Sequence, residues 1–143
     1  MPDVLESPFV LAYDYKRSLG PVIGRFLTSL GERRVEGVRT ASGTVLVPPL
    51  EYDPTTGEAT ETWVEVGQEG LVQSWTYVSN PEPGHPLSTP FAWALVTLDG
   101  ADTAMLHALD APEDQLCRGL RVRIRWRPEP TGSIRDIACF EVA

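Results

Sequence analysis

The sequence predicts a mainly β protein: an N-terminal arm and short helix, degenerate zinc-ribbon-like hairpins, then a five-stranded OB-fold barrel. Three observations support this prediction. Apolar residues recur at helical spacing in residues 21–30. From Val35 onward the apolar period changes to two, and short strand-like runs alternate with turn residues. One acidic helical turn precedes the last predicted barrel strand, an order typical of small closed barrels of the OB type.

The arm and the helix come first. Residues 1–20 contain two prolines and little periodicity, so we expect an extended arm. In the next segment Pro21 suits the first helical turn and Gly31 suits the position just past the helix end. The apolar stripe of this helix consists of Val22, Ile23, Phe26, Leu27 and Leu30. A helix of about three turns must dock on something to persist, either its own barrel or a partner subunit.

The strands follow in order. Short strands are expected at 35–39 and 44–47, around a turn at Ser42-Gly43. Longer runs rich in β-branched, aromatic and aliphatic residues follow at 62–66, 70–78, 91–98, 105–109 and 120–126. Residues 79–90 hold four prolines and are expected to form a long, stiff loop. Residues 111–116, with Pro112 at the start, predict one helical turn.

Bulk composition narrows the class of protein. The chain has 143 residues, 42% of them apolar, which is enough for one compact domain with a core. No apolar run approaches the roughly 18 residues that a membrane helix needs, and no secretory signal pattern is visible. We therefore expect a cytoplasmic protein without a membrane, in which Cys117 and Cys139 are reduced core thiols.

Charge argues against nucleic acid as a partner. The net charge is −8, whereas a nucleic-acid-binding protein needs a basic surface that displaces counterions from phosphates. The charge is uneven, because residues 116–143 carry six arginines against three acids. We therefore expect a local cationic strip on an acidic body.

Residues 39–57 keep the frame of a zinc ribbon without its cysteines. A ribbon of the form C-x-x-C-G, then P-P, then C-P-x-C-G holds zinc between two tight turns. Its glycines and prolines correspond here to Gly43, Pro48-Pro49, Pro54 and Gly57. The four ligand positions hold Arg39, Ser42, Asp53 and Thr56. Only Asp53 suits a metal, so the sequence predicts a metal-free segment that is kept for its shape.

The order of segments resembles a known family. A helix, this ribbon frame, G-L-V-Q-S-W-T-Y-V, P-F-A-W-A-L-V-T-L-D-G, L-R-V-R-I-R-W and a terminal C-F-E-V follow one another over about residues 20–143. This order is similar to that of the OB-fold proteins with an N-terminal rubredoxin-like zinc ribbon that accompany thiolase-fold and acyl-CoA enzymes. The missing cysteines are the departure from the family pattern, and they affect zinc binding but not the fold.

The resemblance implies a function. Members of this family usually dock on a thiolase-fold partner and support it without catalysing a reaction themselves. The metal-free form looks most like the accessory domain of a thiolase-like aldolase in steroid side-chain breakdown. The implied partner is a thiolase-fold aldolase or acyltransferase subunit, and a hydratase subunit is a further expected partner. No cofactor is expected to bind tightly, because the partner would handle the acyl-CoA substrate.

No catalytic residue can be assigned from motifs. Neither G-x-S-x-G nor H-E-x-x-H is present, and there are two histidines. His85 lies in the proline-rich loop. His107 lies in a predicted strand with Asp110 nearby, a pair that could do acid–base work. We favour the alternative, a strand histidine satisfied by a hydrogen bond at the barrel rim.

Four arginines form a row on the strand at 120–126 and just past it. Alternation places Arg121, Arg123, Arg125 and Arg127 on one face. The favoured interpretation is a solvated face paired with acids on neighbouring strands. The alternative is contact with an acidic partner or CoA phosphates, since guanidinium grips phosphate through paired hydrogen bonds.

Apolar side chains supply the other candidates for partner contact. The aromatic residues Trp75, Tyr77, Phe91 and Trp93 are expected in the core. The predicted partner-binding residues are Val22, Phe26, Leu30, Tyr52, Arg121 and Arg123. Tyr13 and Tyr15 are candidates for the same surface.

The sequence thus divides into an arm and helix (1–34), a degenerate ribbon-like segment (35–66) and an OB-fold barrel (67–143). Two functions remain open at this point. One is a non-catalytic accessory subunit of a thiolase-fold acyl-CoA aldolase. The other is a stand-alone OB module that binds a small acyl-CoA ligand or, less favoured, nucleic acid.

Overall fold

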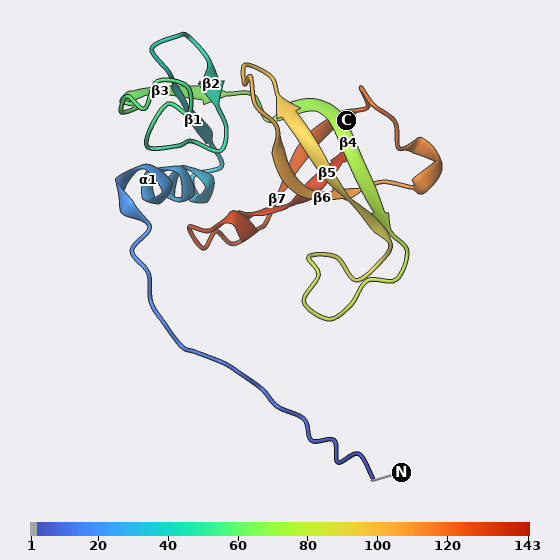
Figure 1. Cartoon of the computed structure of the whole chain (residues 1–143). Helices are drawn as coiled ribbons and strands as arrows, with labels where there is room; N and C mark the ends of the chain where they lie inside the picture. Colours follow the sequence, from blue (N-terminus) through green and yellow to red (C-terminus); the bar gives the residue numbers. More distant parts are fainter. Residues whose placement is uncertain (1–2) are drawn as a thin grey trace.

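The computed structural model describes residues 3–143 and shows an extended arm, a helix, a small sheet and a barrel (Figure 1). In chain order the elements are α1 (Gly20–Gly31), β1 (Val35–Arg39), β2 (Val45–Leu46), β3 (Thr62–Val66), β4 (Glu69–Val78), β5 (Phe91–Leu98), β6 (Met105–Asp110), η1 (Glu113–Gln115), β7 (Arg121–Trp126), η2 (Ile134–Asp136) and β8 (Ile137–Val142). The mainly β fold class predicted from the sequence is confirmed.

The last five strands close into a barrel in the order β4-β5-β6-β8-β7. All neighbours are antiparallel except β6 and β8, which run parallel. Strand β5 has buried residues at every second position from Ala92 to Leu98, as expected for a strand with one face on a core. The backbones of β4 and β5 approach closely at Gly70. A Cβ there would lie 2.3 Å from the Thr97 carbonyl oxygen, so this position requires glycine.

The first three strands form a separate sheet in the order β2-β1-β3. This sheet is fastened to the loop after β5. The Asp102 carboxylate accepts from the Val45 backbone N–H at 2.8 Å, and the Thr103 hydroxyl accepts from the Val47 N–H at 2.8 Å. One buried apolar cluster runs through both parts, from Val35 and Val45 in the sheet to the barrel strands. The two parts therefore share a core.

Helix α1 packs on β1 and on the turn at η2. The side chain of Glu36 on β1 fixes the helix: Arg25 donates to its two oxygens at 2.9 and 3.2 Å, and the Ser29 hydroxyl also donates to it. Hydrogen bonds from Arg25 hold the pKa of Glu36 below its ordinary value against the opposing effect of burial, so this buried carboxylate stays charged. Arg25 also stacks over the Trp63 ring, 4.2 Å from its centroid.

The helix end differs from the prediction. Gly31 is the last helical residue, and the left-handed position belongs to Arg33, with φ of 58°. The backbone N–H groups of Arg33 and Arg34 reach back to the carbonyls of Leu30 and Ser29, which closes the helix. These bonds form although the left-handed position holds arginine and not glycine. The position of Gly31 therefore did not predict where the helix ends.

Several elements match their predicted ranges, and two were missed, the short helix η2 and the barrel strand β8. The strands at 62–66 and 91–98 and the turn after Pro112 lie where the sequence placed them. The short helix η2 had no periodic signal. Within residues 3–143, no helix is long and apolar enough to cross a membrane.

Candidate functional site

The N-terminal arm carries much of the exposed apolar surface. It runs away from the folded body as an extended segment (Figure 1). Eight large apolar side chains on it are exposed, with Leu5 and Phe9 at 95% and 84%. These residues are Val4, Leu5, Phe9, Val10, Leu11, Tyr13, Tyr15 and Leu19. Because these side chains remain in water, they add no hydrophobic free energy to the folding of the chain.

The arm also has a two-residue period. In an extended segment, alternate side chains point to opposite sides. Phe9, Leu11, Tyr13 and Tyr15 therefore share one face, whereas Asp14 shares the other face with small or aliphatic residues. The arm can present one continuous apolar face.

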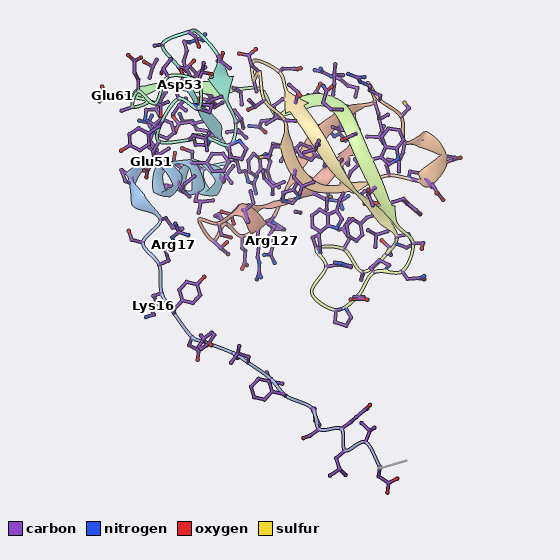
Figure 2. The ribbon with its side chains drawn as sticks, viewed as in Figure 1. Lys16, Arg17, Glu51, Asp53, Glu61 and Arg127 are labelled. Carbon is purple, nitrogen blue, oxygen red and sulfur yellow. The ribbon has the colours of Figure 1, made fainter. Side chains whose placement is uncertain are left out.

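The base of the arm adjoins the ribbon-like hairpins. A Cβ on Gly20 would lie 2.8 Å from the Glu51 carboxylate, so the arm leaves the body beside residues 50–52. Figure 2 shows Glu51 next to the start of α1 and Arg17 just beyond it on the arm. Leu50 and Tyr52 are exposed here, which extends the apolar surface from the arm onto the hairpins.

The helix stripe is covered by the chain itself. Phe26 and Leu30 are 3% and 0% exposed and belong to the main core. The alternative in which a partner covers this stripe is therefore wrong for these two residues, because β1 and the η2 turn already bury them. Val22 is half-buried and Tyr52 is exposed, so their predicted role in partner binding stays a prediction.

Hydrogen bonds close the two turns of the ribbon frame. In the first, the Gly43 N–H donates to the Thr40 carbonyl at 2.9 Å, and the Ser42 and Thr40 hydroxyls bond at 2.9 Å. Arg39, at the first ligand position, donates its guanidinium to the Gly43 carbonyl. A cation engaged in this way does not fit a zinc site.

The second turn is built on Asp53. Its backbone carbonyl accepts from the Gly57 N–H, and its Oδ1 accepts from the Thr55 N–H, both at 2.8 Å. The other oxygen, Oδ2, is buried without a hydrogen-bond partner. Thr56 stands at the fourth ligand position. Its hydroxyl is engaged within the turn, because it accepts a hydrogen bond from the Glu58 N–H. Over residues 3–143, no three His, Cys, Asp or Glu side chains gather as metal ligands.

The arginine row is mostly paired within the chain. Arg121 bonds to Glu69 and Asp99, Arg123 to Glu141, and Arg125 to Asp110 and Glu141. This pattern supports the interpretation as a solvated, acid-paired face. A predicted partner role for Arg121 and Arg123 would require the partner to compete with these carboxylates. Arg127 forms no ion pair with any described residue.

His107 and Asp110 do not form a pair. Asp110 accepts from Arg125 at 3.0 Å, while the His107 ring lies 3.4 Å from the Ile134 carbonyl through Nε2 and accepts from the Ala108 N–H at 2.9 Å through Nδ1. Burial lowers the pKa of His107, and the two backbone hydrogen bonds only partly oppose it. This neutral, bonded ring fits the structural interpretation of His107.

Two predicted core assignments are wrong. Trp75 is 39% exposed although it pairs in register with the buried Ala94, and it lies in the part of β4 that pairs with β5 but not with β7. Cys117 is exposed in the turn before β7. Cys139 is buried as predicted, and burial raises the pKa of its thiol to about 11.

The sequence did not predict one pocket of the described surface. A pocket of about 580 Å³ opens between the proline-rich loop, strands β5 and β6, and the η2 turn. Its lining includes Trp93, Leu106, His107, Arg127 and Arg135, from four separate stretches of chain. Its two arginines are the last of the row, Arg127, and Arg135 of η2, and nothing in the sequence showed that they lie at one pocket.

Residues 63–127 match the family described as the C-terminal OB-fold domain of ChsH2. This range begins in β3 and ends just after β7, and it includes four of the five barrel strands. Over this range the chain is similar to that OB-fold domain. No curated protein matches the chain by sequence.

Two solved structures resemble most of the chain, beyond the range of this family match. A protein of unknown function from the DUF35 family of Sulfolobus solfataricus has a TM-score of 0.67 at 20% identity, covering 87% of this chain and 85% of that one. A structure described as an Ltp2-ChsH2(DUF35) aldolase has a TM-score of 0.65 at 20% identity, covering 89% and 98%. At this identity the likeness shows the fold.

Proposed function

We propose that the chain is a non-catalytic accessory subunit or domain that docks on a thiolase-fold acyl-CoA aldolase. In this proposal the aldolase binds the acyl-CoA and cleaves a steroid side-chain acyl-CoA by a retro-aldol step, in the cytoplasm. The exposed apolar arm is the observation that carries the docking role. The ChsH2-like barrel, and the aldolase named in one similar structure, support the kind of partner.

The arm would dock as an extended strand. Its apolar face, with Phe9 and Leu11 at the centre, suits an open sheet edge or an apolar groove on the partner, where main-chain hydrogen bonds and alternate side-chain pockets act together. Burying one large apolar side chain contributes about 1.5–3 kcal/mol. Part of that gain offsets the ordering of a flexible segment. Leu50 and Tyr52 would continue the contact onto the hairpins.

Three described groups that could act in catalysis, His107, Asp110 and Cys139, are held in other contacts or buried. His107 is neutral and bonded to backbone, and the carboxylate nearest to it in sequence is held by Arg125. Cys139 is buried with a raised thiol pKa. None of these groups is arranged as a nucleophile beside a base.

The test measures binding to the purified aldolase subunit of the same host. Phe9→Asp with Leu11→Asp changes the apolar face, and Val10→Asp with Ala12→Asp places the same charges on the opposite face. We expect the first pair to weaken binding by about a hundredfold or more, and the second by less than about tenfold. Both faces lie outside the folded body, so tryptophan fluorescence should be unchanged in both.

Two results would contradict the proposal in different ways. If a chain lacking residues 1–17 binds the aldolase as tightly as the full chain, the arm is not the docking element. If the full chain does not bind the aldolase at all, the accessory role is wrong. The alternative function, a stand-alone module that binds a small acyl-CoA ligand, would then be favoured by the pocket beside η2.

A further inference from the structure

The pocket beside η2 combines an apolar floor with free cations. Trp93 and Leu106 come from neighbouring barrel strands, and Ile137 begins β8 on the other side. Leu87 from the proline-rich loop and Ile134 from η2 complete the apolar lining. Leu106 and Ile134 are exposed although both are large and apolar. The floor can therefore accept an apolar body.

Arg127 and Arg135 lie at this pocket, and neither forms an ion pair with any residue of the described chain. This distinguishes them from Arg121, Arg123 and Arg125, each of which bonds to at least one carboxylate. The pocket lining contains no Asp or Glu. On a chain with a net charge of −8, two guanidinium groups that form no ion pair form a local positive site, since the one carboxylate next to them in the η2 turn, that of Asp136, is buried and bonded to backbone N–H groups.

Hydrogen bonds to Asp136 hold the turn that carries Arg135 and join it to Arg127. The Asp136 carboxylate accepts from the backbone N–H groups of Thr131, Gly132 and Ser133 at 2.6, 2.7 and 3.2 Å. The Asp136 carbonyl accepts from the Arg127 N–H at 2.8 Å, which ties the end of β7 to the same turn. The backbone of both arginines is thus fixed before any ligand arrives.

The two histidines add polar ring atoms to the pocket lining. His107 is neutral because burial lowers its pKa. His85 accepts from the Glu82 N–H at 2.9 Å through Nδ1, so a neutral His85 ring carries its proton on Nε2. That N–H is a donor on the wall of the pocket.

We propose that this pocket binds a small amphipathic anion, an aromatic or aliphatic body ending in a carboxylate or phosphate group. The apolar body would lie on Trp93 and Leu106, and the anionic end would accept from Arg127 and Arg135. Guanidinium groups bind such oxygens through charge-assisted hydrogen bonds. A volume of about 580 Å³ is within the range of small-molecule sites. Figure 2 shows Arg127 at the lower edge of the barrel, on the side from which the arm departs.

The probe is 1-naphthaleneacetate, with the neutral 1-naphthaleneacetamide as the matched ligand. Binding is followed by two-dimensional NMR of the full chain. We expect the acid to shift the signals of Trp93, Leu106 and Ile137, and the amide to bind at least about tenfold more weakly. The double change Arg127→Gln with Arg135→Gln should weaken binding of the acid by at least about tenfold.

The control variant is Arg17→Gln with Arg118→Gln, which removes the same charge from two exposed sites away from the pocket. We expect its affinity to stay within about twofold of the unchanged chain. The proposal is overturned if acid and amide bind equally, if both double variants lose affinity equally, or if millimolar acid leaves the pocket signals unmoved. These outcomes do not depend on the aldolase, so they are separate from the docking test.

Discussion

Asp136 offers the sharpest test of how the η2 turn is held. Its carboxylate is 2% exposed and accepts four hydrogen bonds, from the N–H and hydroxyl of Thr131 through Oδ1 and from the N–H groups of Gly132 and Ser133 through Oδ2. Burial alone would raise the pKa of Asp136, but these hydrogen bonds outweigh it and hold the pKa below its ordinary value. The change Asp136→Asn keeps the shape and removes the charge.

The expected cost follows from that geometry. An amide keeps one acceptor oxygen, so two of the four hydrogen bonds are lost and an NH₂ group faces N–H donors. A hydrogen bond to a charged group contributes about 1.5–3 kcal/mol. Burying a neutral amide is easier than burying a carboxylate, which offsets part of the loss. We therefore expect the free energy of unfolding to fall by about 3 kcal/mol.

Urea denaturation followed by tryptophan fluorescence measures this. With a slope of about 2 kcal/mol/M, the midpoint should fall by about 1.5 M. The matched control is Asp114→Asn, on an exposed site in η1, which should change stability by less than about 0.5 kcal/mol. If the two variants have the same stability, the four hydrogen bonds do not stabilise the turn as argued.

The pH dependence provides a second readout for Asp136. Because its folded-state pKa is lowered, the stabilisation is fully present above the unfolded value near 3.8 and is lost as pH falls through the folded value. The stability difference between the unchanged chain and Asp136→Asn should therefore shrink as pH drops below 3.8. A constant difference down to the acid transition would contradict this.

Four further outcomes are expected. Phe26→Asp should unfold or strongly destabilise the isolated chain, since it buries an unpaired charge; thermal melting checks this, and a folded variant would show that the helix stripe is open. A thiol reagent should label Cys117 in the native protein and Cys139 only after unfolding; mass spectrometry of the two peptides distinguishes them. Because burial lowers the pKa of His107, stability should fall as pH drops below 6.5, by up to about 1.4 kcal/mol per unit, and His107→Leu should flatten that slope. Elemental analysis should find no stoichiometric zinc, and near-stoichiometric zinc would refute the metal-free interpretation of the ribbon frame.

Most of the fold could be predicted from local patterns. Strand β5 was found at its observed ends because alternation and flanking turn residues agree there. The η2 turn could not be found in this way, because side-chain bonds to Asp136 hold it and no periodic apolar pattern marks it. Trp75 lies in the part of β4 that has β5 but not β7 as a partner, which alternation within a single strand does not reveal.

The candidate sites were harder to predict, because they depend on contacts between segments that are far apart in the sequence. The helix stripe was recognised from its spacing, but spacing does not say which surface covers Phe26 and Leu30. The sequence also predicted that the arginines of the row share one strand face. It did not show which of them form ion pairs, because their carboxylate partners come from β4, β6 and β8. Only the three-dimensional arrangement shows that Arg127 and Arg135 lack such acids and meet at one pocket.

The parallel pairing of β6 with β8 has a consequence for dissecting the chain. The range that matches the ChsH2 family ends at residue 127, but β8 (Ile137–Val142) lies between β6 and β7 and closes the barrel. A fragment cut at residue 127 would leave two unpaired strand edges and uncover the core around Phe140. Such edges template aggregation, so expression trials on a minimal barrel should keep the C-terminus and vary only the arm.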